Sequence, residues 1–276
     1  MAVRVVTDST ADLPREWVDK LNITVVPLTV FFGAEAYKDG VEITREQFFE
    51  RLINGMVHPR TSQPSVGDFV EAYKRLGDEG HEIVSVHVSD KLSGTLNSAR
   101  SAVQQLPNAK VALVDSHLAA LALGLVVKVT AEAAQEGRSF DEVKAVAEDA
   151  SAKTGVYFTP STLEYLQKGG RIGKAQALIG GLLSIKPILT MRDGEIHPYE
   201  KVRTTAKAVA KLKEIATAEG PYAEVGVIHE AQGEAVESLV SHLASMSERP
   251  VVIGQIGAVV GVYTGPGVIG MALRRK

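Results

Sequence analysis

Cysteine is missing from all 276 residues of the chain. This absence excludes disulfide bonds, thiol catalysis and cysteine-ligated zinc, and it is typical of a protein that works in the reducing cytoplasm. Long hydrophobic runs are missing too, because the longest apolar stretch, LAALALGLVV at 118–127, is too short to cross a bilayer. We expect that stretch to form a buried helix. We expect no signal peptide, since MAVRVVTDSTADLP leads directly into a strand pattern.

Neither sign of charge dominates the chain. The formal net charge is −3, with 23% charged and 45% hydrophobic residues. This composition is normal for a folded protein and gives no reason to expect nucleic acid as a partner. The seven histidines are scattered and no carboxylates cluster at ligand spacing, so we predict no metal site.

The first half of the chain alternates β-branched runs with amphipathic stretches. This alternation is typical of a mainly parallel sheet flanked by helices, so we predict an N-terminal α/β domain over 1–153. Two of the helices begin with capping boxes, Thr44 with Gln47 and Ser65 with Asp68. The expected strands are 3–7, 23–32, 82–88 and 110–114, and the expected helices are 14–21, 44–54, 66–77, 96–106, 117–136 and 139–154.

Near residue 154 the pattern changes. Asp193-Gly194 between two apolar runs is a strong hairpin signal, and helices and further strands follow it. We therefore predict a C-terminal α+β domain with a mixed sheet over 154–276. We also expect an apolar helix at 175–183, a strand at 257–263, and a glycine-rich turn with a short tail at the end.

Polar residues follow the predicted parallel strands where each strand ends. They are Asp8-Ser9-Thr10, Ser89 to Thr95 and Asp115-Ser116-His117, and the Thr61-Ser62-Gln63 loop adds a fourth group. Ligands of α/β sheets bind beyond the carboxyl ends of the strands. These segments are rich in hydroxyl groups and poor in strong bases, which suits binding by hydrogen bonds better than acid–base catalysis.

Ser93 is the candidate nucleophile, but the residues that flank it differ from those around the nucleophile of a serine hydrolase. It stands in Lys-Leu-Ser-Gly-Thr, whereas a hydrolase elbow is Gly-x-Ser-x-Gly. His117, His229 and Asp115 are potential partners whose geometry the sequence does not give. A serine hydrolase is therefore an alternative that the motif does not favour.

Two glycine-rich segments resemble phosphate-binding loops. Residues 169–174, GGRIGK, lack the first glycine and the final Ser/Thr of a Walker A loop. Residues 265–270, GPGVIG, match Gly-x-Gly-x-x-Gly, but only six residues follow, too few for a βαβ unit. We interpret both as tight turns with positive φ.

A carboxylate is the group that the turn at Ser93, Gly94 and Thr95 suits best. The first turn of the next helix offers unpaired backbone N–H groups and a positive dipole end. Ser93 and Thr95 add hydroxyl groups, Gly94 permits close approach, and Thr61 or Ser62 could add another hydroxyl group. The other interpretation is that Ser93 or Thr95 only caps the helix.

Eight stretches, in the same order from residue 3 to about 270, resemble the DegV family of bacterial proteins. They are VTDSTADLP (6–14), VVPLTV (25–30), TSQPSVGDF (61–69), VHVSDKLSGTLNSA (86–99), VDSH (114–117), LEYLQKGGRIG (163–173), LLSIKPIL (182–189) and GVYTGPGVIG (261–270). The resemblance implies two α/β domains with a long-chain fatty acid buried between them. The apolar segments 118–127 and 176–185 are then candidate walls of the lipid tunnel.

The resemblance also implies a lipid-binding carrier without a cofactor, similar to the carrier subunit of bacterial fatty acid kinase. Such a carrier takes a fatty acid from the membrane surface and presents its carboxylate to a separate ATP-dependent kinase subunit. The acyl-phosphate product stays bound and feeds phospholipid synthesis. A general lipid carrier with no kinase partner, and a serine acyl-ester hydrolase using Ser93, are the alternatives.

The family's site residues can be placed on this sequence. The resemblance implies that Thr61 and Ser93 hold the carboxylate, that Arg203 lies near it, and that Arg171 meets the kinase. The family usually has histidine where this chain has Tyr263. A phenol still donates a hydrogen bond but stays neutral where histidine can be charged.

Overall fold

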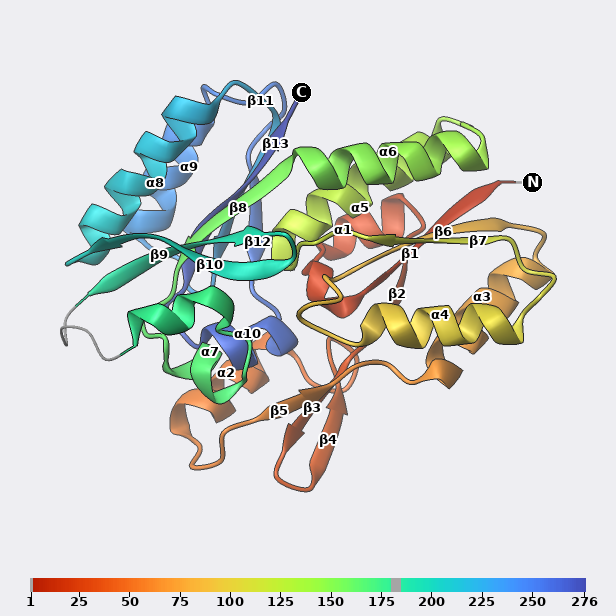
Figure 1. Ribbon diagram of the computed structural model, residues 1–276, viewed down its shortest axis with the longest axis horizontal. Helices are drawn as coiled ribbons and strands as arrows, with labels where there is room; N and C mark the ends of the chain where they lie inside the picture. The colour runs from red at the N-terminus through yellow and green to blue at the C-terminus, as the bar shows by residue number, and fades with distance from the viewer. Residues whose placement is uncertain (1, 180–184) are drawn as a thin grey trace.

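The computed structural model describes residues 2–179 and 185–276, and it confirms the predicted α/β fold (Figure 1). One sheet is fully parallel, in the order β2-β1-β6-β7. Its strands are β1 (Val3–Asp8), β2 (Thr24–Val26), β6 (Glu82–His87) and β7 (Val111–Asp115). The predicted strand at 23–32 is interrupted at Pro27, and its second part, β3 (Thr29–Phe32), joins another sheet.

Helices cover both faces of this parallel sheet, as predicted. Val6 points toward α3 (Val66–Asp78) and α4 (Thr95–Gln105), whereas Val5 points toward α5 (Ala120–Gln135) and α6 (Phe140–Lys153). This alternation follows from the two-residue period of a strand. The short helix α1 (Arg15–Lys20) follows β1.

The second sheet is mixed and has the order β10-β9-β8-β13-β11-β12. Only β11 and β12 pair in parallel, and the Asp193-Gly194 hairpin joins β9 to β10 as predicted. The strands are β8 (Thr154–Thr159), β9 (Lys186–Arg192), β10 (Glu195–Val202), β11 (Tyr222–His229), β12 (Val252–Gln255) and β13 (Ile269–Arg275). Helices α8 (Thr205–Glu219) and α9 (Glu234–Leu243) cover one face of this sheet.

Helix α5 lies between the two large sheets and contacts β1 on one side and β8, β11 and β13 on the other (Figure 1). Residues 120–127 of this helix are all buried, which confirms the predicted buried helix at 118–127 except that the helix begins at Ala120. At Gly124 an added Cβ would lie 2.6 Å from the carbonyl oxygen of Ala11, so glycine permits the close approach of the helix to that loop. None of the helices in residues 2–179 and 185–276 has the length and apolar character needed to span a bilayer.

A small antiparallel sheet lies below the two large ones in Figure 1, in the order β4-β3-β5. It consists of β3, β4 (Glu35–Lys38) and β5 (Arg60–Ser62), and α2 (Arg45–Asn54) lies beside it. Helix α10 (Ala258–Thr264), from the far end of the chain, packs against α2, β3 and β5. The shorter elements are η1 (Ser9–Ala11), α7 (Glu164–Lys168) and η2 (Gly173–Leu178).

Two predicted elements near the C-terminus are wrong. Residues 257–263 form most of α10 rather than a strand, and the expected tail contains β13, which pairs with both β8 and β11. The predicted helix at 175–183 is a 3₁₀ turn over the described part, and 180–184 lie outside the described residues.

All strands of the parallel sheet precede residue 153 and all strands of the mixed sheet follow it. The largest apolar core joins residues of both halves, so the division at 153/154 stays a prediction.

Candidate functional site

A cavity of about 470 Å³ lies between the parallel sheet and the mixed sheet. Its volume is within the range of ~300–1,000 Å³ that is usual for small-molecule sites. Most of its wall is apolar and comes from both halves of the chain, including Val88, Phe158, Ile228 and Val259. The first predicted tunnel wall, 118–127, contributes Ala119 and Ala120 to the lining. The described residues of the second predicted wall, 176–179 and 185, are not among the lining residues. The rest of the second predicted tunnel wall lies outside the described residues.

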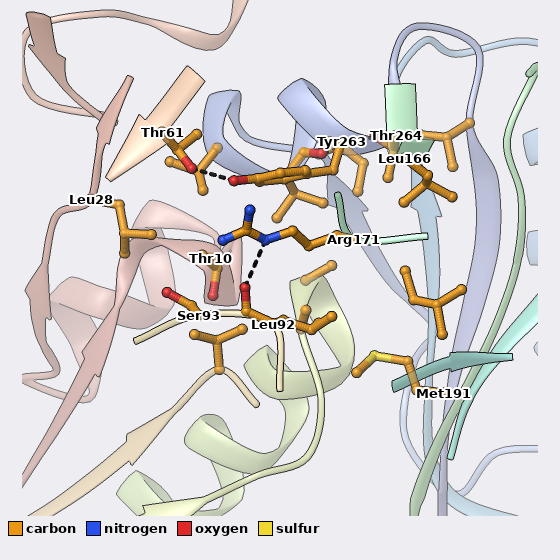
Figure 2. Close-up of a pocket in the computed structure, with 18 of the residues that line it drawn as sticks. Thr10, Leu28, Thr61, Leu92, Ser93, Leu166, Arg171, Met191, Tyr263 and Thr264 are labelled. Carbon is orange, nitrogen blue, oxygen red and sulfur yellow. Dashed lines mark hydrogen bonds between the residues drawn. The ribbon is translucent and has the colours of Figure 1, made fainter. Parts of the chain in front are cut away.

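Hydroxyl groups and one guanidinium group gather at one end of this cavity. Figure 2 shows the guanidinium of Arg171 on the same side as Thr10, Thr61 and Ser93, while Leu166 and Met191 lie on the other side. The cavity is therefore amphipathic, with a polar end and an apolar body. The predicted pair Thr61 and Ser93 lines the same cavity, as the carboxylate interpretation requires.

Thr61 and Tyr263 meet at the polar end. Their hydroxyl oxygens are 2.5 Å apart, and either group can be the donor. Strand β5 positions Thr61 and helix α10 positions Tyr263, so the contact joins residues that are 202 positions apart. The contact of Tyr263 with a ligand head group stays a prediction.

Arg171 is the one cation among the described residues that line the cavity. Its Nε donates to the carbonyl oxygen of Leu92 at 3.0 Å, and Nη1 donates to that of Gly169 at 2.9 Å. The guanidinium carbon lies 5.1 Å from the centre of the Tyr263 ring, within cation–π range. No carboxylate in 2–179 or 185–276 forms an ion pair with it, so the half-buried charge lacks a counter-ion within the described chain.

The turn that precedes α4 differs in detail from the capping interpretation. Gly94 is the N-cap and Thr95 is the first helical residue, so Thr95 does not cap the helix. The Ser93 hydroxyl instead accepts from the Thr95 backbone N–H at 3.3 Å and lies 2.8 Å from the Thr95 hydroxyl. Ser93 lines the cavity, whereas Gly94 and the buried Thr95 are not among its described lining residues.

Gly94 makes room for a neighbouring side chain of the protein. A Cβ at this position would lie 2.0 Å from Oε1 of Gln63, whose amide donates to the Ser98 hydroxyl at 2.8 Å. Gln63 and Ser62 are exposed and also line the cavity. The polar end of the cavity therefore reaches the surface through the loop that follows Thr61.

Arg203 lies apart from this group in the structure. It is an exposed residue in the bend before α8 and is not among the described residues that line the cavity. Its expected place near a head group stays a prediction, as do the individual roles of the other predicted site residues.

Thr10 belongs to the cavity wall, although it is not among the residues that the resemblance implies for the carboxylate. It follows β1, one of the strand ends identified from the sequence, and that position was the available signal. Its hydroxyl donates to Oδ1 of Asp8 at 2.5 Å. Arg171 was expected at a partner surface, and nothing in a glycine-rich turn indicated that its side chain enters the cavity.

Ser93 has no histidine partner among the described residues, since its hydroxyl pairs with Thr95. A serine–histidine–aspartate chain exists elsewhere: Ser85 Oγ is 2.7 Å from His87 Nε2, and His87 Nδ1 is 3.0 Å from Asp8 Oδ2. All three side chains are completely buried, and Ser85 also pairs with Tyr73. This chain forms part of the packed core and lacks the exposed nucleophile of a hydrolase elbow.

The two glycine-rich segments are tight turns, as predicted. Gly170 and Gly173 have φ of 69° and 53°, and Gly265 and Gly267 have φ of 67° and 76°. These values lie in the left-handed region that favours glycine.

Comparison with known families gives a match over nearly the whole chain. Residues 2–276 match the family model described as DegV, a family of uncharacterised proteins. A DegV domain-containing protein of Streptomyces coelicolor is 40% identical over 279 residues, which cover 99% of each chain.

Solved structures with the same fold include two proteins described as binding fatty acid. A DegV family protein from Thermus thermophilus, whose structure is described as showing fatty acid binding, has a TM-score of 0.94 and 35% identity. DegV of Bacillus subtilis, described as a fatty acid binding protein, has a TM-score of 0.89 and 34% identity. Both comparisons cover 100% of each chain.

Proposed function

Because this chain belongs to the DegV family, we propose that it binds a long-chain fatty acid in the cavity between its two large sheets. The observation that carries the proposal is the half-buried Arg171 guanidinium, which has no ion-pair partner among the described residues. Its two hydrogen bonds go to neutral backbone carbonyl groups, so its positive charge can still pair with an anion in the cavity. A fatty acid carboxylate supplies that partner and places its chain along the apolar wall.

The carboxylate lies between Arg171 and the hydroxyl groups of Thr61, Ser93 and Tyr263 in this proposal. Each charge-assisted hydrogen bond is worth about 1.5–3 kcal/mol, so the polar end fixes the orientation of the ligand. The chain supplies most of the affinity. Burying about fourteen methylenes yields roughly 11 kcal/mol before the entropic costs of binding, which reduce the net value to about 5 kcal/mol.

The orientation proposed for the fatty acid supports a carrier role. Ser62 and Gln63 are exposed at the polar end, so the carboxylate lies near the surface while the chain is buried. We therefore propose that a separate ATP-dependent kinase subunit phosphorylates the carboxylate of the bound acid. The acyl-phosphate then serves phospholipid synthesis, and the carrier works in the cytoplasm with transient contacts at the membrane surface.

Denaturing mass spectrometry of the protein purified from cells tests lipid binding. We expect one C14–C18 fatty acid per chain in the extract. A protein that carries no lipid and binds no added oleate contradicts the proposal.

A second assay separates the kinase-linked carrier from a general lipid carrier. The oleate-loaded protein is mixed with a fatty acid kinase catalytic subunit and ATP, and ADP release is followed. We expect ADP release that depends on the loaded carrier. Binding of oleate without ADP release favours the carrier with no kinase partner.

A further inference from the structure

Helix α10 forms part of the wall of the lipid cavity but is only seven residues long. Four of its residues line the cavity, namely Val259, Val260, Tyr263 and Thr264. An isolated helix shorter than ~12–15 residues is marginal in water, because too few hydrogen bonds offset the ordering of its first turn. The position of this part of the wall therefore depends on contacts between α10 and the rest of the chain.

The N-terminus of α10 has no cap from its own part of the sequence. Its N-cap residue is Gly257, which has no side chain to accept a hydrogen bond, and its first turn contains no acidic residue. The first backbone N–H groups of a helix lack partners inside the helix and carry a partial positive charge. Acceptors from elsewhere in the fold must therefore satisfy them.

Two carboxyl groups from the N-terminal half of the chain lie at this helix end. Asp12 Oδ1 accepts from the Gly257 N–H at 3.0 Å. Asp39 accepts hydrogen bonds from the N–H groups of Ala258 and Val259. A Cβ at Gly257 would lie 2.5 Å from Asp12 Oδ1 and 3.9 Å from Asp39 Oδ2, so both carboxyl groups approach the same N-cap. Asp12 and Asp39 thus take the place of a local cap.

The loops that supply these carboxyl groups also form part of the cavity wall. Asp12 has a φ of 47°, and its N–H donates to the Ser9 carbonyl oxygen at 3.3 Å as the C-cap of η1. The Asp39 N–H donates to the Leu28 carbonyl oxygen at 2.9 Å. Thr10, within η1, and Leu28 both line the cavity. The two carboxyl groups therefore connect α10 to a neighbouring part of the same wall.

Asp12 lies in surroundings that are unfavourable for a carboxylate. Burial, and after it repulsion by Asp39, raises its pKa, although the Gly257 N–H opposes the shift. Its second oxygen, Oδ2, is buried and makes no hydrogen bond, so among the described residues Gly257 is the one hydrogen-bond partner of this side chain. Carboxyl groups perturbed in this way cluster at functional sites, which supports a role for Asp12 beyond folding.

Tyr263, in the last turn of α10, is sensitive to any displacement of the helix. A Cβ at Gly169 would lie 2.3 Å from Tyr263 Cδ1, so the tyrosine ring packs directly on that glycine. The Tyr263 hydroxyl pairs with Thr61, and the ring lies beside the Arg171 guanidinium (Figure 2). A shift of α10 by about 1 Å would take the two hydroxyl oxygens beyond the usual hydrogen-bond distance.

We propose that Asp12 and Asp39 are positioning residues for the fatty acid site: by capping α10 they hold Tyr263 against Thr61 and keep the apolar residues of α10 in the cavity wall. This role rests on the proposed function, because it concerns the affinity for the bound acid. Neither carboxyl group is among the described residues that line the cavity, so both act through α10. Without the cap, α10 is in place in only a fraction of the molecules, and the apparent Kd rises by the inverse of that fraction.

Isothermal titration of the delipidated full chain with oleate tests this role. Asp12→Ala should raise the Kd about tenfold. Asp12→Asn should stay within about threefold of the unchanged protein, because its amide oxygen still accepts from the Gly257 N–H. An unchanged Kd in Asp12→Ala, or an equal loss of affinity in Asp12→Asn and Asp12→Ala, overturns the proposal.

A matched control separates positioning from a general loss of stability. Glu142→Ala removes a carboxylate that caps α6, a helix with no residue among the described lining of the cavity. It should lower the stability of the protein without changing the Kd for oleate. If Glu142→Ala weakens oleate binding as much as Asp12→Ala does, the effect of Asp12 is only structural and the proposal fails.

Hydrogen exchange of the ligand-free protein measures α10 without reference to a ligand. The amides of α10 should exchange about tenfold faster in Asp12→Ala, while those of the parallel sheet keep their rates. If the unchanged protein binds no oleate, the proposed function fails and the positioning role fails with it, whatever the exchange rates are. If the unchanged protein binds oleate and α10 exchanges faster in Asp12→Ala without a loss of affinity, only the positioning role fails.

Asp39→Asn provides the test if Asp12→Ala does not fold. The substitution removes the negative charge at the N-terminus of α10 and keeps the shape of the side chain. It should raise the Kd for oleate about threefold and speed the exchange of the α10 amides by a similar factor. No change in either measurement overturns the role of Asp39.

Discussion

The hydroxyl oxygens of Thr61 and Tyr263 lie 2.5 Å apart, although 202 positions separate the two residues in the chain. The contact joins a strand of the small sheet to the helix that closes the cavity from the other half of the molecule. The two hydroxyl groups therefore form one hydrogen-bonded pair at the polar end of the cavity. Removing either hydroxyl group breaks this hydrogen bond and leaves the apolar wall intact.

Tyr263→Phe should weaken oleate binding about threefold to tenfold, because it removes one hydrogen bond worth about 0.5–1.5 kcal/mol. Isothermal titration of the delipidated protein measures the change. Tyr199→Phe, at a half-exposed tyrosine on β10, is the control and should leave the Kd unchanged. An unchanged Kd in Tyr263→Phe would show that the phenol makes no contact with the head group.

Arg171→Met should lower the affinity for oleate by about tenfold to a hundredfold, because the carboxylate loses its cation. The affinity for methyl oleate should change far less, since a neutral ester makes no ion pair. Competition against a fluorescent fatty acid gives both values. Lys174→Met, at an exposed lysine on η2, is the control. An equal loss for oleate and its ester would assign Arg171 a structural role.

Ser93→Ala should weaken oleate binding and lower the free energy of unfolding by about 1 kcal/mol, because the hydroxyl also accepts from the Thr95 N–H. The same variant tests the hydrolase alternative. We expect the unchanged protein and Ser93→Ala to hydrolyse p-nitrophenyl esters at the same background rate. Ester turnover that disappears in Ser93→Ala would establish a serine hydrolase.

Local signals were sufficient to predict most of the fold. The capping boxes at Thr44 and Ser65 fixed where α2 and α3 begin, and Asp193-Gly194 fixed the β9–β10 hairpin. These signals act over a few residues, so a sequence displays them directly. The polar strand ends at Thr10 and Ser93 were likewise visible, because the carboxyl ends of parallel strands form one edge.

The errors lie where distant contacts decide the structure. Residues 257–263 are rich in valine and predict a strand, yet they form α10, whose N-cap N–H donates to Asp12 Oδ1 at 3.0 Å. Nothing near that segment in the sequence indicates a carboxylate 245 positions away. The direction of the Arg171 side chain depends in the same way on the Leu92 carbonyl group.

Asp39 should make the stability depend on pH. Burial raises its pKa from 3.8 to about 6, although hydrogen bonds from Ser9, Ala258 and Val259 oppose the shift and nearby Asp8 adds to it. Between these values the folded protein keeps a proton that the unfolded chain has released. The free energy of unfolding should therefore fall as pH rises from about 4 to about 6, by an amount on the order of 3 kcal/mol from this group.

Urea denaturation across that pH range, for the unchanged protein and for Asp39→Asn, measures the contribution of Asp39 together with its effect on Asp12, whose pKa is raised by burial and by the charge of Asp39. The lowered pKa of His229 has the opposite effect, because the free energy of unfolding then falls as pH drops below about 6.5. His229 is present in both proteins, so its contribution is common to the two curves. The difference between the two proteins should therefore change across the range. A constant difference would mean that Asp39 titrates alike in the folded and unfolded chains.

Gly94→Ala should displace the Gln63 side chain, because the new methyl group would lie 2.0 Å from Gln63 Oε1. The Gln63 side chain is exposed and can move aside, so the free energy of unfolding should fall by about 1 kcal/mol, chiefly because the hydrogen bond to Ser98 is lost. In Gln63→Ala that bond is already lost, so adding Gly94→Ala should cost almost nothing further. A double-mutant cycle by urea denaturation measures this coupling. Additive effects of the two substitutions would show that the backbone at residue 94, rather than the Gln63 contact, requires glycine.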